Sequence, residues 1–399
     1  MRIGLLTQFY RPEMGAPQNR LYEMACGLKE LNNEVFVVTA MPNYPTGKIF
    51  PKYKGLFSCI ETENSIEIKR YWLYASNVRK TIPRIWNMLS FSIISFCCIP
   101  YLKKKKLDYL IVESPPLTLA WAGRWIAKFS GAKLITNISD LWPLSAKELG
   151  AMSDGVFYHI LEKLENYIYR KSHIIIGQSD EIISYIKYHG GKNTYLFRNG
   201  VDPTRFDLSN KRVRHFGEPI RIVYAGLLGF AQGIANICRN VNFKKLQVEF
   251  HIYGAGGEQN EIEEIIRENP DNGIFYHGIV SRDELPNVLL QADMSLIPLV
   301  RNIYGAVPSK IYESMAAGLP IMFMGGGEGA KIVSNNKLGL VAGSKDYEVL
   351  KKNILYLVSH SEDITAMTEN CIESANLRFN RPKQIASLNE YLTKYIKAD

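Results

Sequence analysis

The chain has 399 residues, more than one ordinary hydrophobic core can organise, so its length predicts at least two domains. Apolar residues make up 46% and charged residues 22%, a balance that is typical of globular proteins and excludes a disordered or fibrous chain. The net charge of +9 is compatible with nucleic acid, an anionic membrane or a phosphorylated substrate and does not choose among them.

The cysteines and the N-terminal segment bear on location. Six cysteines show no CxxC pair or regular spacing, which argues against a disulfide framework and a structural zinc site. Met1 leads directly into a strand-like segment, without the charged leader and apolar stretch of a secretory signal. A cytoplasmic location is therefore expected.

The first half of the chain alternates short apolar strands with helical patterns. "RIGLLTQF" is followed by a predicted helix and then by "EVFVVTA", which together form a βαβ unit with parallel strands. The apolar face of that helix is predicted to carry Leu21, Met24, Ala25, Leu28 and Leu31. Further strands are predicted at "DYLIVESPP", "AKLITNISD" and "HIIIGQSD".

A second βα series begins at "IRIVYAGLLGFAQGI", after a polar segment that resembles a linker. We therefore predict an α/β fold with two Rossmann-like βαβ domains, residues 1–205 and 206–380, which face each other across a ligand-binding cleft. Residues 381–399 are predicted to form a helix that packs back across the domains, with Ile385, Leu388, Leu392 and Ile396 near helical spacing.

The basic excess is concentrated in residues 79–107, which contain seven Lys or Arg residues and no Asp or Glu. The uncharged run at 85–102 is long enough for a membrane span, but strand-like segments of one domain bracket it, which argues against a span. Two interpretations remain open. The run is either a buried helix that ends in solvated lysines or a helix lying on an anionic membrane surface.

Three glycine-containing loops in the second half follow predicted strands, where backbone N–H groups can approach phosphate. They contain Gly226 with Gly229, Gly254 with Gly256 and Gly257, and Gly325 to Gly327. The dinucleotide fingerprint is incomplete and no Walker lysine follows, so an NAD enzyme or a P-loop ATPase is disfavoured. The three loops together favour a nucleotide ligand.

The segment "SKIYE" adds a polar group at the start of a helix. Ser309 is predicted to cap the helix and contact a phosphate oxygen, Lys310 to supply positive charge, and Glu313 to accept two ribose hydroxyls. The alternative is an ordinary Ser-capped helix start with an exposed lysine.

The chain resembles the retaining glycosyltransferases of family 4, which have the two-domain GT-B fold and use nucleotide-activated sugars. The resemblance rests on "FYRPEMGAPQNRLYEMACGLKELNNEVFVVT", "NGVD", "YAGLLG", "YGAGGE", "HGIVSRDELPNVLLQADMSLIPL" and "SKIYESMAAGLPI", in the order of the family. "MPNYPTGKIFPKYKG" and "SDLWPLSAKELG" look most like the branch that builds bacterial O antigens and capsules, which includes N-acetyl-L-fucosamine transferases.

This resemblance implies a donor site in the second domain. Glu313 would hold the ribose, the backbone around Ile279 and Val280 would flank the base, and the Gly226 loop would lie at the diphosphate. Gly229, Gln232, Gly254 and Ser309 complete the predicted donor-binding set. The chain departs from the family at Gly305, where an acidic residue is usual, and at Leu227 or Leu228 and Gln232, where the family has Arg and Lys. Lys310 is predicted to restore the missing charge and to act in catalysis.

On the acceptor side, the first 158 residues contain no histidine, so the N-domain histidine of many family members is absent. Asp140, in "SDLWP", becomes the predicted catalytic group, and an N-cap of the following turn is its alternative. Arg11, Glu13 and Gly15 lie in the first strand-to-helix loop and are predicted on the acceptor side. The alternative to an acceptor-side role for Arg11 is an exposed surface charge.

The resemblance implies retention, with attack from the leaving-group face, a donor phosphate oxygen that takes the acceptor proton, and no protein nucleophile. The expected donor is a UDP-sugar and the expected acceptor a lipid-diphosphate-linked saccharide, at the cytoplasmic face of the inner membrane. Nucleic acid is not expected as a partner. No D-x-D motif occurs, so no metal is expected, and helix N-termini would assist Lys310. A nucleotide-sugar epimerase of the same architecture and a non-catalytic nucleotide-sugar-binding protein are the alternatives.

Overall fold

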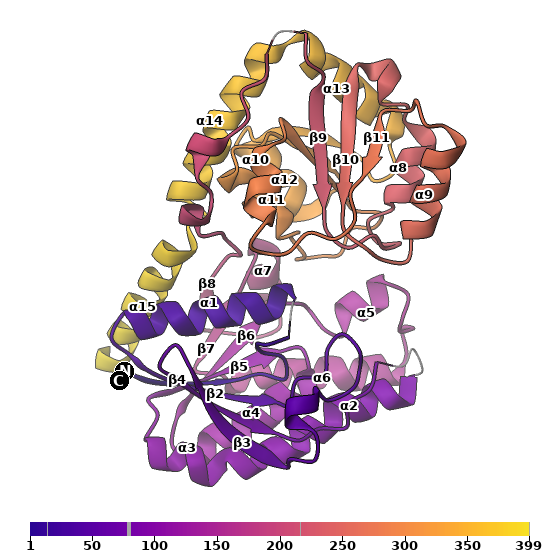
Figure 1. Ribbon diagram of the computed structural model, residues 1–399. Helices are drawn as coiled ribbons and strands as arrows, with labels where there is room; N and C mark the ends of the chain where they lie inside the picture. The colour runs from indigo at the N-terminus through magenta and orange to yellow at the C-terminus, as the bar shows by residue number, and fades with distance from the viewer. Residues whose placement is uncertain (14, 78–80, 216, 399) are drawn as a thin grey trace. The chain divides into compact units, whose positions relative to one another are not determined.

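A computed structural model describes residues 1–13, 15–77, 81–215 and 217–398, and the chain divides into two compact units (Figure 1). Unit 1 comprises Met1–Arg198 and Pro382–Asp399, and unit 2 comprises Asn199–Arg381. The predicted boundary after residue 205 is therefore moved to residue 198. Its physical reason is that Val201 lies in the core of unit 2, where its backbone N–H donates to the carbonyl of Phe379 at 3.0 Å.

Unit 1 is built on an eight-stranded sheet with the order β3-β4-β2-β1-β5-β6-β7-β8. All neighbouring strands are parallel except β3 and β4, which form an antiparallel edge hairpin. The strands are β1 (Arg2–Leu6), β2 (Glu34–Ala40), β3 (Ser58–Glu63), β4 (Ile66–Tyr71), β5 (Tyr109–Ser114), β6 (Lys133–Ile138), β7 (Ile174–Gly177) and β8 (Thr194–Leu196). The strand order reverses between β1 and β5, which marks the carboxyl end of this strand pair as the expected ligand edge.

Helices cover both faces of this sheet because successive side chains along each strand point to opposite sides. Leu5 packs toward the face covered by α1 (Ala16–Glu30) and α15 (Arg381–Ala398), whereas Leu6 packs toward the other face. That second face carries α2 (Thr81–Ile94), α3 (Ile99–Lys105), α4 (Leu117–Ser130), α6 (Val156–Lys171) and α7 (Asp180–Tyr188). The short α5 (Leu144–Glu148) follows β6.

Residues 381–399 were predicted to form a separate helix that packs back across the domains. The helix is present, but from Pro382 onward it belongs to unit 1 and completes the core of that unit. Ile385, Leu388 and Leu392 are at most 3% exposed and pack with residues of α1 and the strands. The Tyr109 hydroxyl donates to the Leu392 carbonyl at 2.9 Å. The prediction for α1 was wrong at Leu31, which lies beyond the end of the helix and is 38% exposed.

One helical stretch of the described residues, Ile85–Lys105, is long and apolar enough to cross a membrane, and 39% of its most apolar window is buried. It comprises most of α2, a 3-10 segment at Ser95–Cys98 and α3. Phe91, Cys98 and Leu102 have no solvent exposure. The stretch connects β4 to β5 of one sheet, and its inner side therefore belongs to the core of unit 1.

Unit 2 contains a six-stranded parallel sheet with the order β11-β10-β9-β12-β13-β14. The strands are β9 (Ile220–Ala225), β10 (Val248–Tyr253), β11 (Ile274–Tyr276), β12 (Met294–Pro298), β13 (Ile321–Met324) and β14 (Gly339–Ala342). One face packs on α8 (Ile234–Asn240), α9 (Gln259–Glu268) and α13 (Tyr347–Ser359). The other packs on α10 (Leu285–Leu290), α11 (Lys310–Ala316), α12 (Gly327–Asn335) and α14 (Ser361–Leu377). The order reverses between β9 and β12.

Candidate active site

Two glycine loops of unit 2 are pressed together at the carboxyl ends of β9 and β10. The Gly226 N–H donates to the Tyr253 carbonyl at 2.8 Å, and the Leu228 N–H donates to the Ala255 carbonyl at 3.0 Å. Gly254 has φ +140°, and a Cβ atom there would overlap the carbonyl oxygen of Gly226. Glycine is therefore required at 254 by both the backbone conformation and the close approach of the neighbouring loop.

We expect Gly254→Ala to lower the free energy of unfolding of unit 2 by about 2–3 kcal/mol, through backbone strain and steric overlap. Calorimetry measures this loss. Gly257→Ala is the matched control, since the nearest neighbouring atom would lie 3.8 Å from its Cβ, an ordinary contact. Equal stability of the two variants would contradict the steric argument.

The Lys310 side chain lies directly over Gly226. A Cβ on residue 226 would collide with the Lys310 ammonium group, whose Nζ lies 5.5 Å from the centroid of the Tyr224 ring. Burial lowers the pKa of Lys310, and the nearby Glu313 carboxylate opposes this. The order-reversal point of the sheet, between β9 and β12, thus holds a desolvated cation beside the half-buried backbone of Gly226. Such a group favours an anionic ligand.

The start of α11 differs from the prediction at Ser309. Ser309 precedes the helix in helical conformation, is exposed and makes no side-chain capping hydrogen bond. The predicted side-chain cap is therefore wrong. Glu313 is half-buried one turn further along the helix.

The partial positive charge at the N-terminus of α8 is already compensated by a carboxylate of the protein. Glu258 is 2% exposed, and its Oε2 accepts from the backbone N–H of Ala235 at 3.3 Å. Burial raises the pKa of Glu258, and its backbone hydrogen bonds with Ala235 and Ile234 oppose this. A carboxylate of the protein therefore takes the place that an anionic ligand would have at this helix end.

The remaining predicted donor residues surround the two glycine loops. Gly229 accepts from the Gln232 backbone N–H at 2.9 Å. The side-chain oxygen of Gln232 is buried, without a hydrogen-bond partner in the described part of the chain. Gly278 accepts from the Gly254 N–H at 2.7 Å, which places Ile279 and Val280 next to that loop, and Ile279 is 80% exposed.

A cavity of unit 2 with a volume of 640 Å³ lies away from the glycine loops. Its lining includes Ile220, Val248 and Gly273, which lie at the amino-terminal ends of the strands. The glycine loops and Lys310 are at the opposite, carboxyl edge, where open α/β sheets bind ligands. The edge with the glycine loops is therefore the candidate site. No three His, Cys, Asp or Glu side chains of the described residues are grouped to hold a metal ion.

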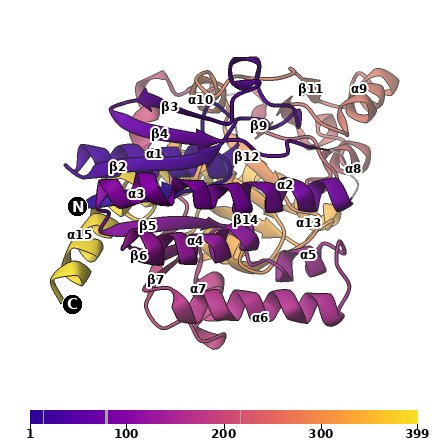
Figure 2. The ribbon, with the colours of Figure 1, turned by 90° about the horizontal axis from the view of Figure 1, so that it is seen from below.

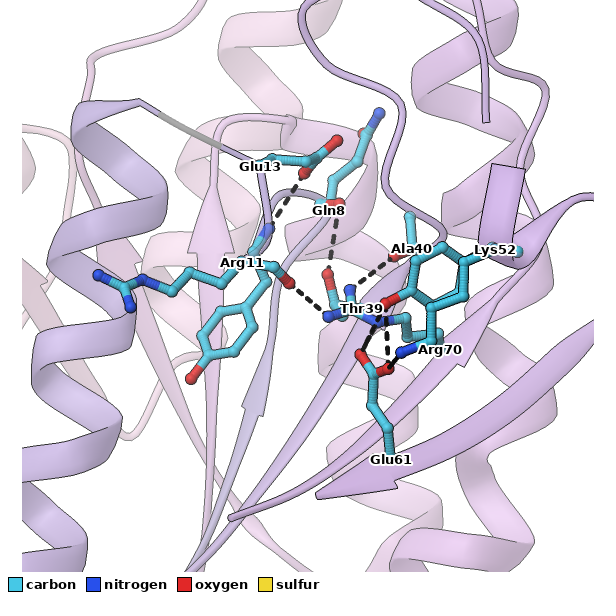
Figure 3. Close-up of polar contacts among 10 residues, drawn as sticks. Gln8, Arg11, Glu13, Thr39, Ala40, Lys52, Glu61 and Arg70 are labelled. Atoms are coloured by element: carbon cyan, nitrogen blue, oxygen red, sulfur yellow. Dashed lines mark hydrogen bonds and ion pairs between the residues drawn. The ribbon is translucent and has the colours of Figure 1, made fainter. Parts of the chain in front are cut away.

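In unit 1, the first strand-to-helix loop is held by buried charges (Figure 3). The Glu13 carboxylate is 2% exposed and accepts from the backbone N–H groups of Tyr10, Asn43 and Tyr44 at 3.3, 2.7 and 2.8 Å. Burial raises its pKa, and these bonds oppose the shift. Glu13 therefore fixes the loop, and its contact with an acceptor stays a prediction. The guanidinium of Arg70, a residue that is 1% exposed, donates a hydrogen bond to the Arg11 carbonyl.

The other two residues of this loop remain partly accessible. The Arg11 guanidinium lies 3.7 Å from the centroid of the Tyr22 ring and 4.0 Å from Glu63, and it extends away from the Arg70–Glu61 pair in Figure 3. Arg11 is thus a packed, half-buried cation. Gly15 precedes α1, where its carbonyl accepts from the Asn19 N–H at 3.0 Å.

Asp140 follows β6 and is half-buried. The Ser145 hydroxyl donates to its Oδ2 at 3.1 Å. Burial raises the pKa of Asp140, and the hydrogen bonds from Ser145 and the Leu141 N–H oppose this. Both bonds hold the turn that leads into α5, whose N-cap residue is Pro143.

Comparisons with known proteins agree with this architecture. Residues 217–360 match the family described as glycosyl transferases, group 1. The chain has the GT-B fold, and residues 217–360 of unit 2 are similar to the group 1 glycosyl transferases. A protein of Escherichia coli K12 named colanic acid biosynthesis glycosyl transferase WcaI is 25% identical over 334 residues, which cover 80% of this chain and 82% of WcaI.

Two solved GT-B structures align over nearly the whole chain. Sucrose-phosphate synthase from Thermosynechococcus elongatus has a TM-score of 0.75 at 14% identity and covers 100% of both chains. Anabaena Alr3699/HepE in complex with UDP has a TM-score of 0.73 at 13% identity and covers 99% of this chain and 100% of its own.

Sequence reasoning missed a buried polar cluster of unit 1 at the carboxyl ends of β5 to β7. Glu113 and Arg20 are at most 5% exposed and form an ion pair at 2.7 Å. Asn137 and Ser139 also donate to Glu113, and Arg20 donates to Gln178. Burial raises the pKa of Glu113, and Arg20 opposes this. The signal was available, since Glu113 interrupts an apolar strand whose residues are all buried.

Proposed function

We propose that this protein transfers a sugar from a UDP-sugar to a lipid-diphosphate-linked saccharide during synthesis of a bacterial surface polysaccharide, with retention of configuration. The expected sugar is an N-acetylated deoxyhexosamine. The name of WcaI, which refers to colanic acid biosynthesis, supports the polysaccharide context, and the complex of Alr3699/HepE with UDP supports the nucleotide. A peripheral position at the cytoplasmic membrane face belongs to the same proposal.

The observation that carries the proposal is the position of Lys310 over Gly226. The ammonium group and the glycine backbone meet where the strand order of unit 2 reverses. A diphosphate there gains a counter-charge that is already desolvated, so little reorganisation is needed when the leaving group develops charge. Glu313, one turn along α11, is the proposed ribose ligand.

In the proposed reaction, the acceptor hydroxyl oxygen forms a bond to the anomeric carbon while the bond from that carbon to the UDP oxygen breaks. The acceptor proton moves to a phosphate oxygen of the departing UDP. Lys310 stabilises the charge on UDP, and Gln232 is the proposed hydrogen-bond donor through its side-chain amide nitrogen. Asp140 is the proposed polar group on the acceptor side.

The pH dependence of UDP binding tests the site. Burial holds the pKa of Lys310 below its usual range, and a bound diphosphate would raise it. Above about pH 7, where phosphate is fully ionised, the UDP affinity should fall as the pH rises through the lowered lysine pKa. Titration calorimetry in buffers of different ionisation enthalpy should show proton uptake, which Lys310→Ala removes.

A pH-independent affinity, or the same pH dependence in Lys310→Ala, would contradict this assignment. Product analysis then separates the alternatives. A transferase forms product only when both UDP-sugar and acceptor are present, an epimerase converts the donor alone, and a binding protein releases no product.

A further inference from the structure

Ser139 connects β6 to Asp140, and each of its polar groups is held by another part of unit 1. Its backbone N–H donates to the Ser114 carbonyl at 2.9 Å. Its hydroxyl donates to the Glu113 carboxylate and, at 3.2 Å, to the Ser114 carbonyl. Its own carbonyl accepts from the side-chain amide of Gln178. Ser139 is only half-buried, so water could satisfy these groups, and burial alone does not require the protein contacts.

These contacts belong to a closed ring of hydrogen bonds, which we name the Ser139 ring. Ser139 and Arg20 both donate to Glu113, and the Arg20 bond is 2.7 Å long. Arg20 also donates to the side-chain oxygen of Gln178, whose amide nitrogen returns to the Ser139 carbonyl. The four members come from α1 and from the carboxyl ends of β5, β6 and β7, which lie side by side in the sheet, as Figure 2 shows. Four segments that are separate in the sequence therefore converge on one residue.

Stability alone does not account for the Ser139 ring. Glu113 and Arg20 are at most 5% exposed, and the removal of both charges from water costs about as much as their attraction returns. Apolar side chains of similar volume in both places would give unit 1 a comparable stability. A fully bonded buried network instead fixes one arrangement of the segments that it joins. The ring therefore holds a specific geometry at the carboxyl edge of the sheet.

The geometry that the ring fixes is that of the peptide bond between Ser139 and Asp140. A peptide unit is planar, so a hydrogen bond to the Ser139 carbonyl also orients the N–H group and the Cα atom of Asp140. On the other side, the Asp140 carboxylate accepts from the Ser145 hydroxyl at 3.1 Å. Asp140 is thus held through its backbone by the ring and through its side chain by α5.

We propose that the Ser139 ring holds Asp140 in the orientation that the acceptor requires, which makes Gln178, Arg20 and Glu113 positioning residues of the transfer reaction. This role rests on the proposed function, in which Asp140 is the polar group on the acceptor side. The carboxyl edge of the strands is where open α/β sheets bind ligands. A reacting group there is effective only when neighbouring residues hold it within a fraction of an ångström of its productive position.

Gln178 is the member of the ring that tests this role most cleanly. Gln178→Met removes both amide contacts, keeps the length of the side chain and leaves the Arg20–Glu113 pair in place. We expect kcat/KM for the acceptor to fall about ten-fold to 100-fold, because a displacement of about 1 Å has an effect of this size. UDP affinity should stay unchanged. Asn193→Leu is the matched control, since its amide donates to the His173 carbonyl at 3.0 Å, at the opposite end of β7.

A double-mutant cycle with Asp140→Asn separates positioning from a general structural defect. When Gln178 acts through Asp140, Gln178→Met should cost less than about two-fold in the Asp140→Asn background. An equal loss in both backgrounds would overturn the proposal, because a structural defect does not depend on the carboxylate. A parent-like rate in Asp140→Asn would overturn it as well.

A measurement without substrates tests the ring independently of the reaction. Burial and the charge of Glu148 raise the pKa of Asp140, which a carboxyl ¹³C NMR titration measures. In Gln178→Met the loosened segment admits water, so this pKa should fall toward about 3.9, the ordinary value of aspartate, whereas Asn193→Leu should leave it unchanged. An unchanged pKa in Gln178→Met would overturn positioning by the ring. A lowered pKa without any transfer by the parent would count against the proposed function and not against the ring.

Discussion

Replacement of Lys310 by alanine is expected to slow sugar transfer about 100-fold to 1,000-fold, the range measured when one preorganised group that stabilises developing charge is removed. The effect is large because Lys310 is the cation that lies over the Gly226 backbone, and Glu258 already occupies the nearby helix end. Transfer kinetics at saturating donor measure it.

The thermal stability of Lys310→Ala, unlike its transfer rate, should not decrease. Lys310 is desolvated in the unliganded protein, so its removal relieves an electrostatic cost and should leave the melting temperature unchanged or slightly higher. Lys352→Ala, at an exposed lysine on α13, is the matched control and should keep the parent rate. Lys310→Arg retains the charge but has a larger head group for the tight space over Gly226, so partial activity is expected. A parent-like rate in Lys310→Ala would rule out the assigned role.

Arg20→Met is expected to lower the free energy of unfolding of unit 1 by about 3–5 kcal/mol. The reason is that it leaves the Glu113 carboxylate buried without its charged partner. Urea denaturation followed by tryptophan fluorescence isolates this unit, because Trp72, Trp86, Trp121, Trp125 and Trp142 all lie in unit 1.

The pH dependence gives this prediction a second readout. Burial raises the pKa of Glu113, and loss of Arg20 raises it further, so the folded variant holds this proton at a higher pH than the unfolded chain does. The stability loss relative to the parent should therefore grow as the pH rises through the raised pKa of Glu113 in the parent, because above it only the folded variant still holds the proton.

Two further variants act as controls for the buried pair. Arg2→Met disrupts an exposed pair with Glu34 at 3.2 Å and should cost less than about 1 kcal/mol. The double variant Arg20→Met, Glu113→Gln should recover part of the loss, since it removes the orphaned charge. If Arg20→Met and Arg2→Met cost the same, the Glu113 site is not a desolvated pair.

The buried strands were predictable because a parallel strand covered on both sides is a continuous apolar run, as in β5. β3 was missed because it is an edge strand whose alternating Glu61 and Glu63 resemble a polar loop. The error at Leu31 has a similar origin, since apolar spacing continues past Glu30 although the helix ends there.

The candidate site was predictable only in its separate parts. The glycines after strands and the "SKIYE" segment identified Gly226 and Lys310 individually. That Lys310 lies over Gly226 depends on the order of β9 and β12 in the sheet. The contribution of Glu13 to holding its loop was not predictable, because its partners, Asn43 and Tyr44, belong to the loop after another strand. Side-chain direction and partners across strands are properties of the assembled sheet.

The docking of α15 in the core of unit 1 sets an order for biosynthesis. Residues 199–381 form unit 2 from one continuous piece of chain, whereas Ile385, Leu388 and Leu392 reach unit 1 only after the whole of unit 2 has been translated. At typical ribosome speeds this interval is on the order of 10–40 s. During that time α1 and its strands lack their final apolar cover. Unit 2, although second in the chain, is therefore the first that can fold to completion on the ribosome.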